Sequence, residues 1–166
     1  MKLDRSTFCP LLLGLALATS APAQLIRIAS GDLTPEASVI TFSEVAYGSL
    51  NPEFTVATAT LGLVDVSFAS HFVGQSRSGS SVVTLTGSPT GPLALDFTSG
   101  TVFITDDGAN PTSPVLSGSP TFNGPISVFF SKPVAAVGLD GGYFNAIGGT
   151  SIEAFNASGS SLGIVH

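Results

Sequence analysis

Pro125-Ile-Ser-Val-Phe-Phe-Ser-Lys-Pro133 is the first of four short apolar runs that decide the fold class of this chain. The other three are Val134-Ala-Ala-Val-Gly-Leu-Asp-Gly-Gly142, Thr150-Ser-Ile-Glu-Ala-Phe-Asn156 and Ser161-Leu-Gly-Ile-Val165. Each run is rich in β-branched or aromatic residues, and Gly, Pro, Asn or Ser separates it from the next. Such runs with tight connections are typical of consecutive β-strands. We therefore expect four strands within residues 125–165.

Seven further segments closer to the N-terminus have the composition of short strands. They are 24–29, 36–47, 54–58, 63–68, 82–86, 93–98 and 101–105. The clearest is 63–68, where Val64, Val66 and Phe68 alternate with Asp65 and Ser67, a pattern that predicts a strand with one solvated face. For 36–47 the β-branched and aromatic centre favours a strand, and a helix of one or two turns is the alternative.

Two expectations concern how neighbouring segments are connected. In 93–98, alternation predicts that Leu93, Leu95 and Phe97 face inward, while Asp96 and Thr98 face outward. Ser99-Gly100 is a link of hairpin length, so 93–98 is expected to pair with 101–105. Residues 106–123 are polar and rich in proline, which predicts a long loop.

The predicted fold is all-β: an antiparallel β-sandwich of jelly-roll or lectin-like character, in one domain over 24–166. About ten short strands at these spacings favour a sandwich or a barrel. The 19 glycines and 11 prolines leave little room for helices. The sequence ends at His166 within a strand-like run, so we expect its C-terminal strands to be missing.

The first 23 residues have the three parts of a secretory signal peptide. Met1-Lys-Leu-Asp-Arg5 carries positive charge, residues 8–18 are almost wholly apolar, and Ala21-Pro-Ala23 is a small-residue cleavage site. The apolar part is shorter than the roughly 20 residues of a membrane span. We expect cleavage between Ala23 and Gln24, a secreted or cell-surface location, and no membrane span in the mature chain.

The composition of the mature chain limits its partners. Residues 24–166 number 143, with ten acidic side chains against three basic ones, Arg27, Arg77 and Lys132, which gives a net charge of −7. So few cations form no basic patch to neutralise phosphates, which disfavours binding to nucleic acid and to an anionic membrane surface. We therefore expect no nucleic-acid partner. The one cysteine, Cys9, lies in the signal peptide, so no disulfide is expected.

Two loops contain candidate binding residues. Asp106, Asp107 and Asn110 place three oxygen-bearing side chains in one loop, and Asp140 is a further candidate calcium ligand. A simple turn is the alternative, because Asp, Gly and Asn are turn formers. The second loop is glycine-rich and carries Tyr143, Phe144 and Asn145. Aromatic rings on such a loop stack on sugars, while the alternative is that Phe144 closes the end of the core.

No catalytic constellation is visible in the sequence. Gly159-Ser-Ser-Leu-Gly163 matches the Gly-x-Ser-x-Gly nucleophile pattern, but a strand rather than a helix follows it, so a hairpin is the better interpretation. His71 has no partner set for zinc and is expected to be half-buried and hydrogen-bonded. Any carboxylate pair for glycoside hydrolysis would come from Glu44, Glu53, Asp65, Asp96 and Glu153.

Several segments also resemble a family of uncharacterised secreted bacterial proteins, many of which carry a C-terminal PEP-CTERM sorting tail. The resemblance covers roughly 38–165 and is most specific from 123 to 163. It rests on Leu95-Asp-Phe97, Thr101-Val-Phe-Ile-Thr-Asp-Asp107, Pro114-Val-Leu-Ser-Gly-Ser-Pro120, Asn123-Gly-Pro-Ile-Ser127, Val137-Gly-Leu-Asp-Gly-Gly-Tyr-Phe144, Ser151-Ile-Glu-Ala-Phe-Asn-Ala-Ser-Gly159 and Leu162-Gly163. The resemblance implies export and a sandwich fold, and it implies no catalytic residues. The sorting tail itself is not found in these 166 residues.

Three functions remain open from the sequence. The first is a non-enzymatic exported protein of the envelope or extracellular matrix that binds extracellular polysaccharide, with calcium as the only cofactor considered. The second is a structural or adhesion component that associates with itself through open strand edges. The third is a glycan hydrolase.

Overall fold

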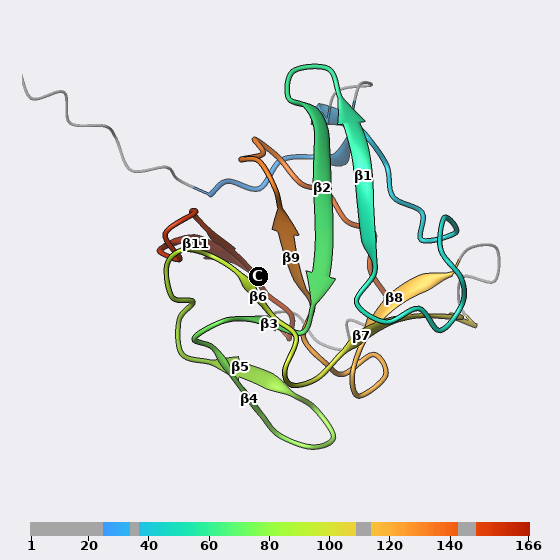
Figure 1. The fold of residues 1–166 in the computed structure, drawn as a ribbon, viewed down its shortest axis with the longest axis vertical. Coiled ribbons are helices and arrows are strands. Elements are labelled where there is room, and N and C mark those ends of the chain that lie inside the picture. Colours follow the sequence, from blue (N-terminus) through green and yellow to red (C-terminus); the bar gives the residue numbers. More distant parts are fainter. Residues whose placement is uncertain (1–24, 34–36, 109–113, 143–148) are drawn as a thin grey trace, which may run out of the picture.

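The computed structural model describes residues 25–33, 37–108, 114–142 and 149–166 (Figure 1). Of the described residues, 36% lie in strands and 2% in helix, so the predicted all-β class is confirmed. The elements are the 3-10 helix η1 (Ser30–Asp32) and the strands β1 (Glu53–Thr58), β2 (Gly62–Ala69), β3 (His71–Phe72), β4 (Ser76–Ser78), β5 (Thr84–Thr86), β6 (Leu95–Asp96), β7 (Val102–Thr105), β8 (Val115–Gly118), β9 (Ser127–Phe130), β10 (Ile152–Phe155) and β11 (Ser161–Val165).

The largest sheet has three antiparallel strands in the order β1-β2-β9. Its centre is β2, where Val64, Val66 and Phe68 are buried and Asp65 lies on the opposite, solvated face. This is the predicted alternation, and it is confirmed. Phe68 packs edge-on against Phe54 of β1, with ring centroids 5.9 Å apart. The hydrophobic core therefore begins on one face of this sheet.

A second group of strands supplies the other side of the core. Strand β7 pairs with β8, and on its other edge it pairs with residues 48–51 through hydrogen bonds from Gly48 N to Ile104 O and from Asn51 N to Val102 O. Val102 and Ile104 are completely buried, and Val102 packs into the same cluster as the core face of β2. Segments distant in sequence thus enclose the core between them.

The remaining strands form three small antiparallel pairs: β3 with β6, β4 with β5, and β10 with β11. The last is a hairpin, as expected from the Asn, Ser and Gly residues between its strands. The described residues thus form five separate sheets rather than two continuous layers. The jelly-roll or lectin-like sandwich, and the single domain over 24–166, therefore stay predictions.

Three segments expected to be strands are irregular. Residues 25–29, 37–47 and 134–142 contain no strand in the described part of the chain. In 37–47 the reason is local: Glu44 accepts hydrogen bonds from Thr41 N and Oγ1, and Phe42 adopts a positive φ of 64°. That turn directs the Phe42 ring against Phe54 and Phe68, 5.9 and 5.8 Å away. Neither the strand nor the alternative helix is present there.

The expected hairpin across Ser99-Gly100 is wrong. Strand β6 pairs with β3, whereas β7 pairs with β8, which lies inside the segment 106–123 that was expected to be a loop. Phe97 was expected to face inward but is 54% exposed. The reason is that Asp96 Oδ1 accepts hydrogen bonds from Thr98 N and Oγ1, a turn that ends β6 and stops the alternation.

The helical content of the described residues is limited to η1, and none of their helices is long and apolar enough to cross a membrane.

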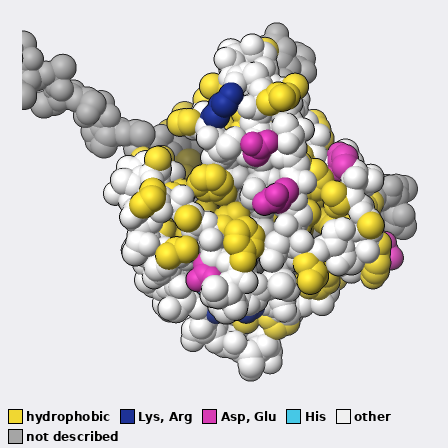
Figure 2. Space-filling model, viewed as in Figure 1, with side chains coloured by type: hydrophobic (Ala, Val, Ile, Leu, Met, Phe, Trp, Pro, Cys, Tyr) yellow, Lys and Arg dark blue, Asp and Glu magenta, His cyan; other side chains and the backbone are white. Residues whose placement is uncertain are grey.

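Hydrophobic side chains are also common at the surface. Figure 2 shows them at several separate places on the viewed face, with few charged side chains between them.

Candidate functional site

The two predicted binding loops begin at different places in the fold. Asp106 and Asp107 directly follow β7, and Asp140 lies in the irregular segment 134–142. Asp106 and Asp140 are exposed, but Asp107 is only 8% exposed. A carboxylate on a loop is rarely buried without partners, and Asp107 does have interactions within the structure.

The structure brings these loops together at Asp107 and Gly142. A Cβ atom added to Gly142 would lie 3.9 Å from Asp107 Oδ2, an ordinary van der Waals contact. The residues predicted to bind a ligand, Tyr143, Phe144 and Asn145, follow Gly142 directly in the sequence. They lie outside the described residues, as does Asn110 of the predicted calcium loop. The described ends of the two loops are therefore neighbours, which their separation in the sequence did not reveal.

The carboxylates of this region do not form a compact metal cluster. Within the described residues, no group of three or more His, Cys, Asp or Glu side chains is placed to hold a metal ion. Asp106, Asp107 and Asp140 are thus not arranged as three ligands of one ion. Calcium binding stays a prediction. Asn110 lies outside the described residues, and calcium also accepts amide and backbone carbonyl oxygens as ligands, so a site does not require three carboxylates.

A groove beside β1 was not anticipated from the sequence. Its volume is about 600 Å³, and it separates the edge strand β1 from the irregular segment 38–45. Hydrophobic and polar residues contribute to its walls. They are Ser38, Val39, Ile40, Glu44, Val45, Glu53, Phe54, Thr55, Val56 and Ala57. No sequence signal marks this groove, because segment 38–45 was expected to be a strand or a helix.

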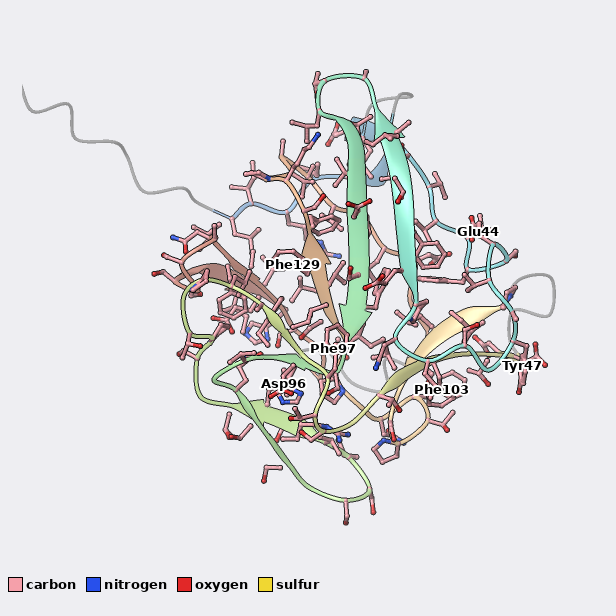
Figure 3. All side chains as sticks on the ribbon, in the orientation of Figure 1. Glu44, Tyr47, Asp96, Phe97, Phe103 and Phe129 are labelled. Atoms are coloured by element: carbon pink, nitrogen blue, oxygen red, sulfur yellow. The ribbon has the colours of Figure 1, made fainter. Side chains whose placement is uncertain are left out.

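Two of the five carboxylates considered for glycoside hydrolysis line this groove. Glu44 comes from the segment beside β1, where Figure 3 labels it, and Glu53 is the first residue of β1. The backbone N–H of Thr41, together with the Thr41 hydroxyl, holds the pKa of Glu44 below its ordinary value of 4.5. Glu44 therefore stays ionised near neutral pH and acts as a hydrogen-bond acceptor with a fixed orientation.

The other three carboxylates have separate partners. Asp65 Oδ1 accepts from Thr55 Oγ1 at 2.7 Å, Glu153 Oε1 accepts from Ser161 Oγ at 2.6 Å, and Asp96 binds Thr98. Ser161, the central residue of the Gly-x-Ser-x-Gly run, begins β11 after a turn. The hairpin interpretation of that run is confirmed.

His71 was expected to be half-buried, but it is almost completely buried at 2% exposure. The expected hydrogen bonding is present: Nδ1 lies 2.7 Å from Ser70 Oγ, and Nε2 lies 3.5 Å from Asp96 Oδ2. Serine, histidine and aspartate are thus adjacent, as in a hydrolase triad. Ser70 is fully buried, however, and its hydroxyl has His71 and Ser99 as hydrogen-bond partners, as is usual for a buried polar group.

Comparison of the chain with protein-family models found no match. No curated protein matched the sequence, and no solved structure matched the fold.

Proposed function

We propose that this chain is an exported, non-enzymatic protein of the cell envelope or extracellular matrix that binds extracellular polysaccharide. The observation that carries the proposal is the proximity of Asp107 to Gly142, since a Cβ atom built on Gly142 would lie 3.9 Å from Asp107 Oδ2. The end of β7 is therefore followed by residues that lie close to the start of the glycine-rich loop. The candidate oxygen ligands Asp106 and Asp107 and the candidate aromatic residues Tyr143 and Phe144 lie at or close to these neighbouring positions in the sequence, and we propose that they act together. Sugars are commonly held by aromatic faces together with hydrogen-bond acceptors, and this region offers residues of both kinds.

The test uses the chain from Gln24 to His166 on a glycan array, followed by calorimetry with any polysaccharide that binds. We expect Tyr143→Ala and Phe144→Ala to weaken binding by roughly tenfold or more, as expected for an aromatic residue that contacts the ligand. Tyr47→Ala is the matched control, because Tyr47 is 67% exposed and lies in another segment (Figure 3). Absence of glycan binding, or equal losses in Tyr47→Ala, would contradict the proposal.

Calcium is the one cofactor in this proposal. Calorimetry with calcium chloride is expected to give measurable heat, and Asp106→Asn is expected to reduce the calcium affinity because it removes a candidate anionic ligand. Glu153→Asn is the control, since Glu153 is an exposed carboxylate on β10. If calcium gives neither heat nor a shift in melting temperature, the calcium part of the proposal fails while polysaccharide binding is judged separately.

Export is proposed from the features of residues 1–23, which lie outside the described residues. Material secreted by a host that processes signal peptides is expected to begin at Gln24. N-terminal sequencing measures this directly. A secreted product that retains Met1 would contradict it.

A second candidate function is self-association through strand edges. The observation that favours it is the β10–β11 hairpin, which is paired with no other strand in the described residues and exposes Ile152 (47%) and Ile164 (50%). Isolated two-stranded sheets gain stability from further strands. Light scattering is expected to show mass rising with concentration, and Ile164→Lys is expected to suppress that rise. A monomer at every concentration would contradict this candidate.

Glycoside hydrolysis remains the third candidate, and of the five carboxylates considered for it, Glu44 and Glu53 line the same groove. Such an enzyme requires one carboxyl with a raised pKa as general acid. The pKa of Glu44 is lowered, which suits an acceptor better than an acid. Glycan cleavage that is abolished by Glu44→Gln would favour this third candidate over the first.

A further inference from the structure

We propose that the edge of β1, together with the groove beside it, binds an extended basic polypeptide segment as an additional β-strand. This inference goes beyond polysaccharide binding, since it concerns a different surface from the loops around Asp107 and Gly142. Three observations support it. Among the described residues, the edge of β1 has backbone groups without a hydrogen-bond partner, the groove is about as long as a short strand, and two carboxylates line its walls.

The register of the sheet shows which backbone groups of β1 face the groove. Phe68 N donates to Pro52 O, so Pro52 and Phe68 form a hydrogen-bonded pair of the antiparallel ladder. Because such pairs alternate along the strand, Phe54 and Val56 also bond to β2. The N–H and C=O groups of Glu53, Thr55 and Ala57 therefore point away from β2.

The far side of β2 agrees with this register. Ser131 N donates to Asp65 O, so the odd-numbered residues of β2 bond toward β9 and the even-numbered ones toward β1. Ser38 Oγ donates to Ala57 O across the groove, which also requires that Ala57 face outward. In the described part of the chain, no hydrogen bond outside the β1–β2 ladder reaches the N–H or C=O of Thr55. The edge thus has an unused donor and acceptor at Thr55, whereas at Ala57 the C=O is already bonded to Ser38 Oγ and only the N–H points outward without a hydrogen bond to the described residues.

The groove extends along most of that edge. Five consecutive residues of β1, from Glu53 to Ala57, line it, and its volume is about 600 Å³. A strand rises about 3.3 Å per residue, so this length matches an incoming segment of four or five residues. Val39, which is 75% exposed, and the half-buried Ile40 and Val45 supply apolar surface for alternate side chains of that segment.

The negative charge of the groove-lining residues favours a basic occupant. Glu44 and Glu53 place two carboxylates on the groove, and the groove-lining residues include no Lys, Arg or His. Thr41 holds the Glu44 carboxylate in place through two hydrogen bonds of 3.0 Å. A second copy of this chain, with a net charge of −6, is repelled by such a groove. A segment with lysine or arginine beside apolar residues is attracted to it, and it adds backbone hydrogen bonds to the edge of β1.

The test uses the chain from Gln24 to His166 and a capped hexapeptide that alternates lysine and valine. Calorimetry gives the affinity, and hydrogen exchange read by NMR gives the location. We expect the peptide to slow exchange at the amides of Thr55 and Ala57, while those of Phe54 and Val56 change little because they already bond to β2. Such a two-residue alternation is the signature of strand addition.

Variants separate charge from backbone pairing. Glu44→Gln with Glu53→Gln is expected to weaken the peptide about three- to tenfold, as two exposed ion pairs would predict. Glu153→Gln, on the distant hairpin, is the matched control and is expected to have no effect. Ala57→Pro removes an outward N–H and is expected to abolish the alternating protection. The melting temperature of each variant checks that it is folded.

The outcomes are distinct. A valine–glutamate hexapeptide that binds as tightly as the lysine peptide would overturn the choice of a basic partner. If the amides of Thr55 and Ala57 became protected from exchange as the protein concentration rises, without any peptide, the occupant would be a second copy of the chain. That result would also overturn the choice of a basic partner. Binding that perturbs Glu44 and Glu53 without protecting Thr55 would overturn strand addition. None of these results depends on whether the loops at Asp107 bind polysaccharide.

Discussion

His71 and Asp96 face each other across the β3–β6 pair, with Nε2 of the imidazole 3.5 Å from Oδ2 of the carboxylate. The other ring nitrogen, Nδ1, is 2.7 Å from Ser70 Oγ, and that hydroxyl also donates to Ser99 O at 2.9 Å. Both nitrogens of a nearly fully buried ring therefore have partners. Because β3 and β6 contain only two residues each, this polar cluster is a main connection between them.

Stability is expected to fall in acid partly through Asp96. Hydrogen bonds from the Thr98 side chain and backbone, with a smaller contribution from the charge of His71, lower the pKa of Asp96 below 3.8. The folded state then binds this proton less tightly than the unfolded state. The stabilisation is thus present above pH 3.8 and lost as pH falls through the lower folded pKa. Urea unfolding at a series of pH values measures it, and Asp96→Asn is expected to flatten the acid side of the curve. An unchanged acid side in that variant would contradict this assignment.

Ser70→Ala is expected to destabilise the protein by about 1–3 kcal/mol, because it leaves the buried His71 Nδ1 without its partner and removes the hydrogen bond to Ser99 O. Chemical denaturation measures the change. The control is Ser81→Ala, since Ser81 is exposed and its substitution is expected to stay within about 0.5 kcal/mol. Equal effects of the two substitutions would show that the buried cluster has no special energetic role.

Val64→Ala is expected to cost about 2–3 kcal/mol, because Val64 is 1% exposed at the centre of the core and its loss leaves a cavity. The adjacent Leu63 is 65% exposed, so Leu63→Ala is expected to change the free energy of unfolding by less than about 0.5 kcal/mol. The contrast between neighbouring residues tests the orientation of β2. If Leu63→Ala proved the more costly, the strand would be in the opposite register.

Gly124→Ala is expected to destabilise the protein by about 1–3 kcal/mol, because its new Cβ would overlap the backbone N and O of Ser119. Backbone atoms of a neighbouring segment cannot move aside as a flexible side chain does. Gly108 has no heavy atom within 4 Å of such a Cβ, so Gly108→Ala is the control and is expected to be neutral or slightly stabilising. Thermal melting of both variants decides whether residues 119 and 124 are as close as described.

The elements predicted best from the sequence are those decided by local pattern. The alternation in 63–68 identified the core face of β2, because side chains of a strand point to opposite faces with a period of two. The Asn, Ser and Gly residues at 156–160 identified the β10–β11 hairpin, because they form a turn within a few residues. Composition was likewise sufficient for the all-β class.

The errors concern partners that are distant in the sequence. Ser99-Gly100 has hairpin length, yet β7 pairs with β8 and with 48–51, an arrangement in which Val102 and Ile104 are completely buried. For 37–47, strand propensity was outweighed by the packing of Phe42 between two other phenylalanines. Predictions of this kind require knowledge of long-range contacts, which no local window contains.

Local sequence patterns were sufficient to predict that this chain builds short strands, which strand faces are apolar, and which residue types are available for binding. The pairing of β9 with β2, the proximity of Asp107 to Gly142, and the groove with Glu44 and Glu53 along the edge of β1 became apparent only in the folded chain. Periodicity and turn chemistry act between neighbours in the chain. The choice of strand partner depends instead on which distant apolar surfaces bury each other, and that is decided by the whole fold at once.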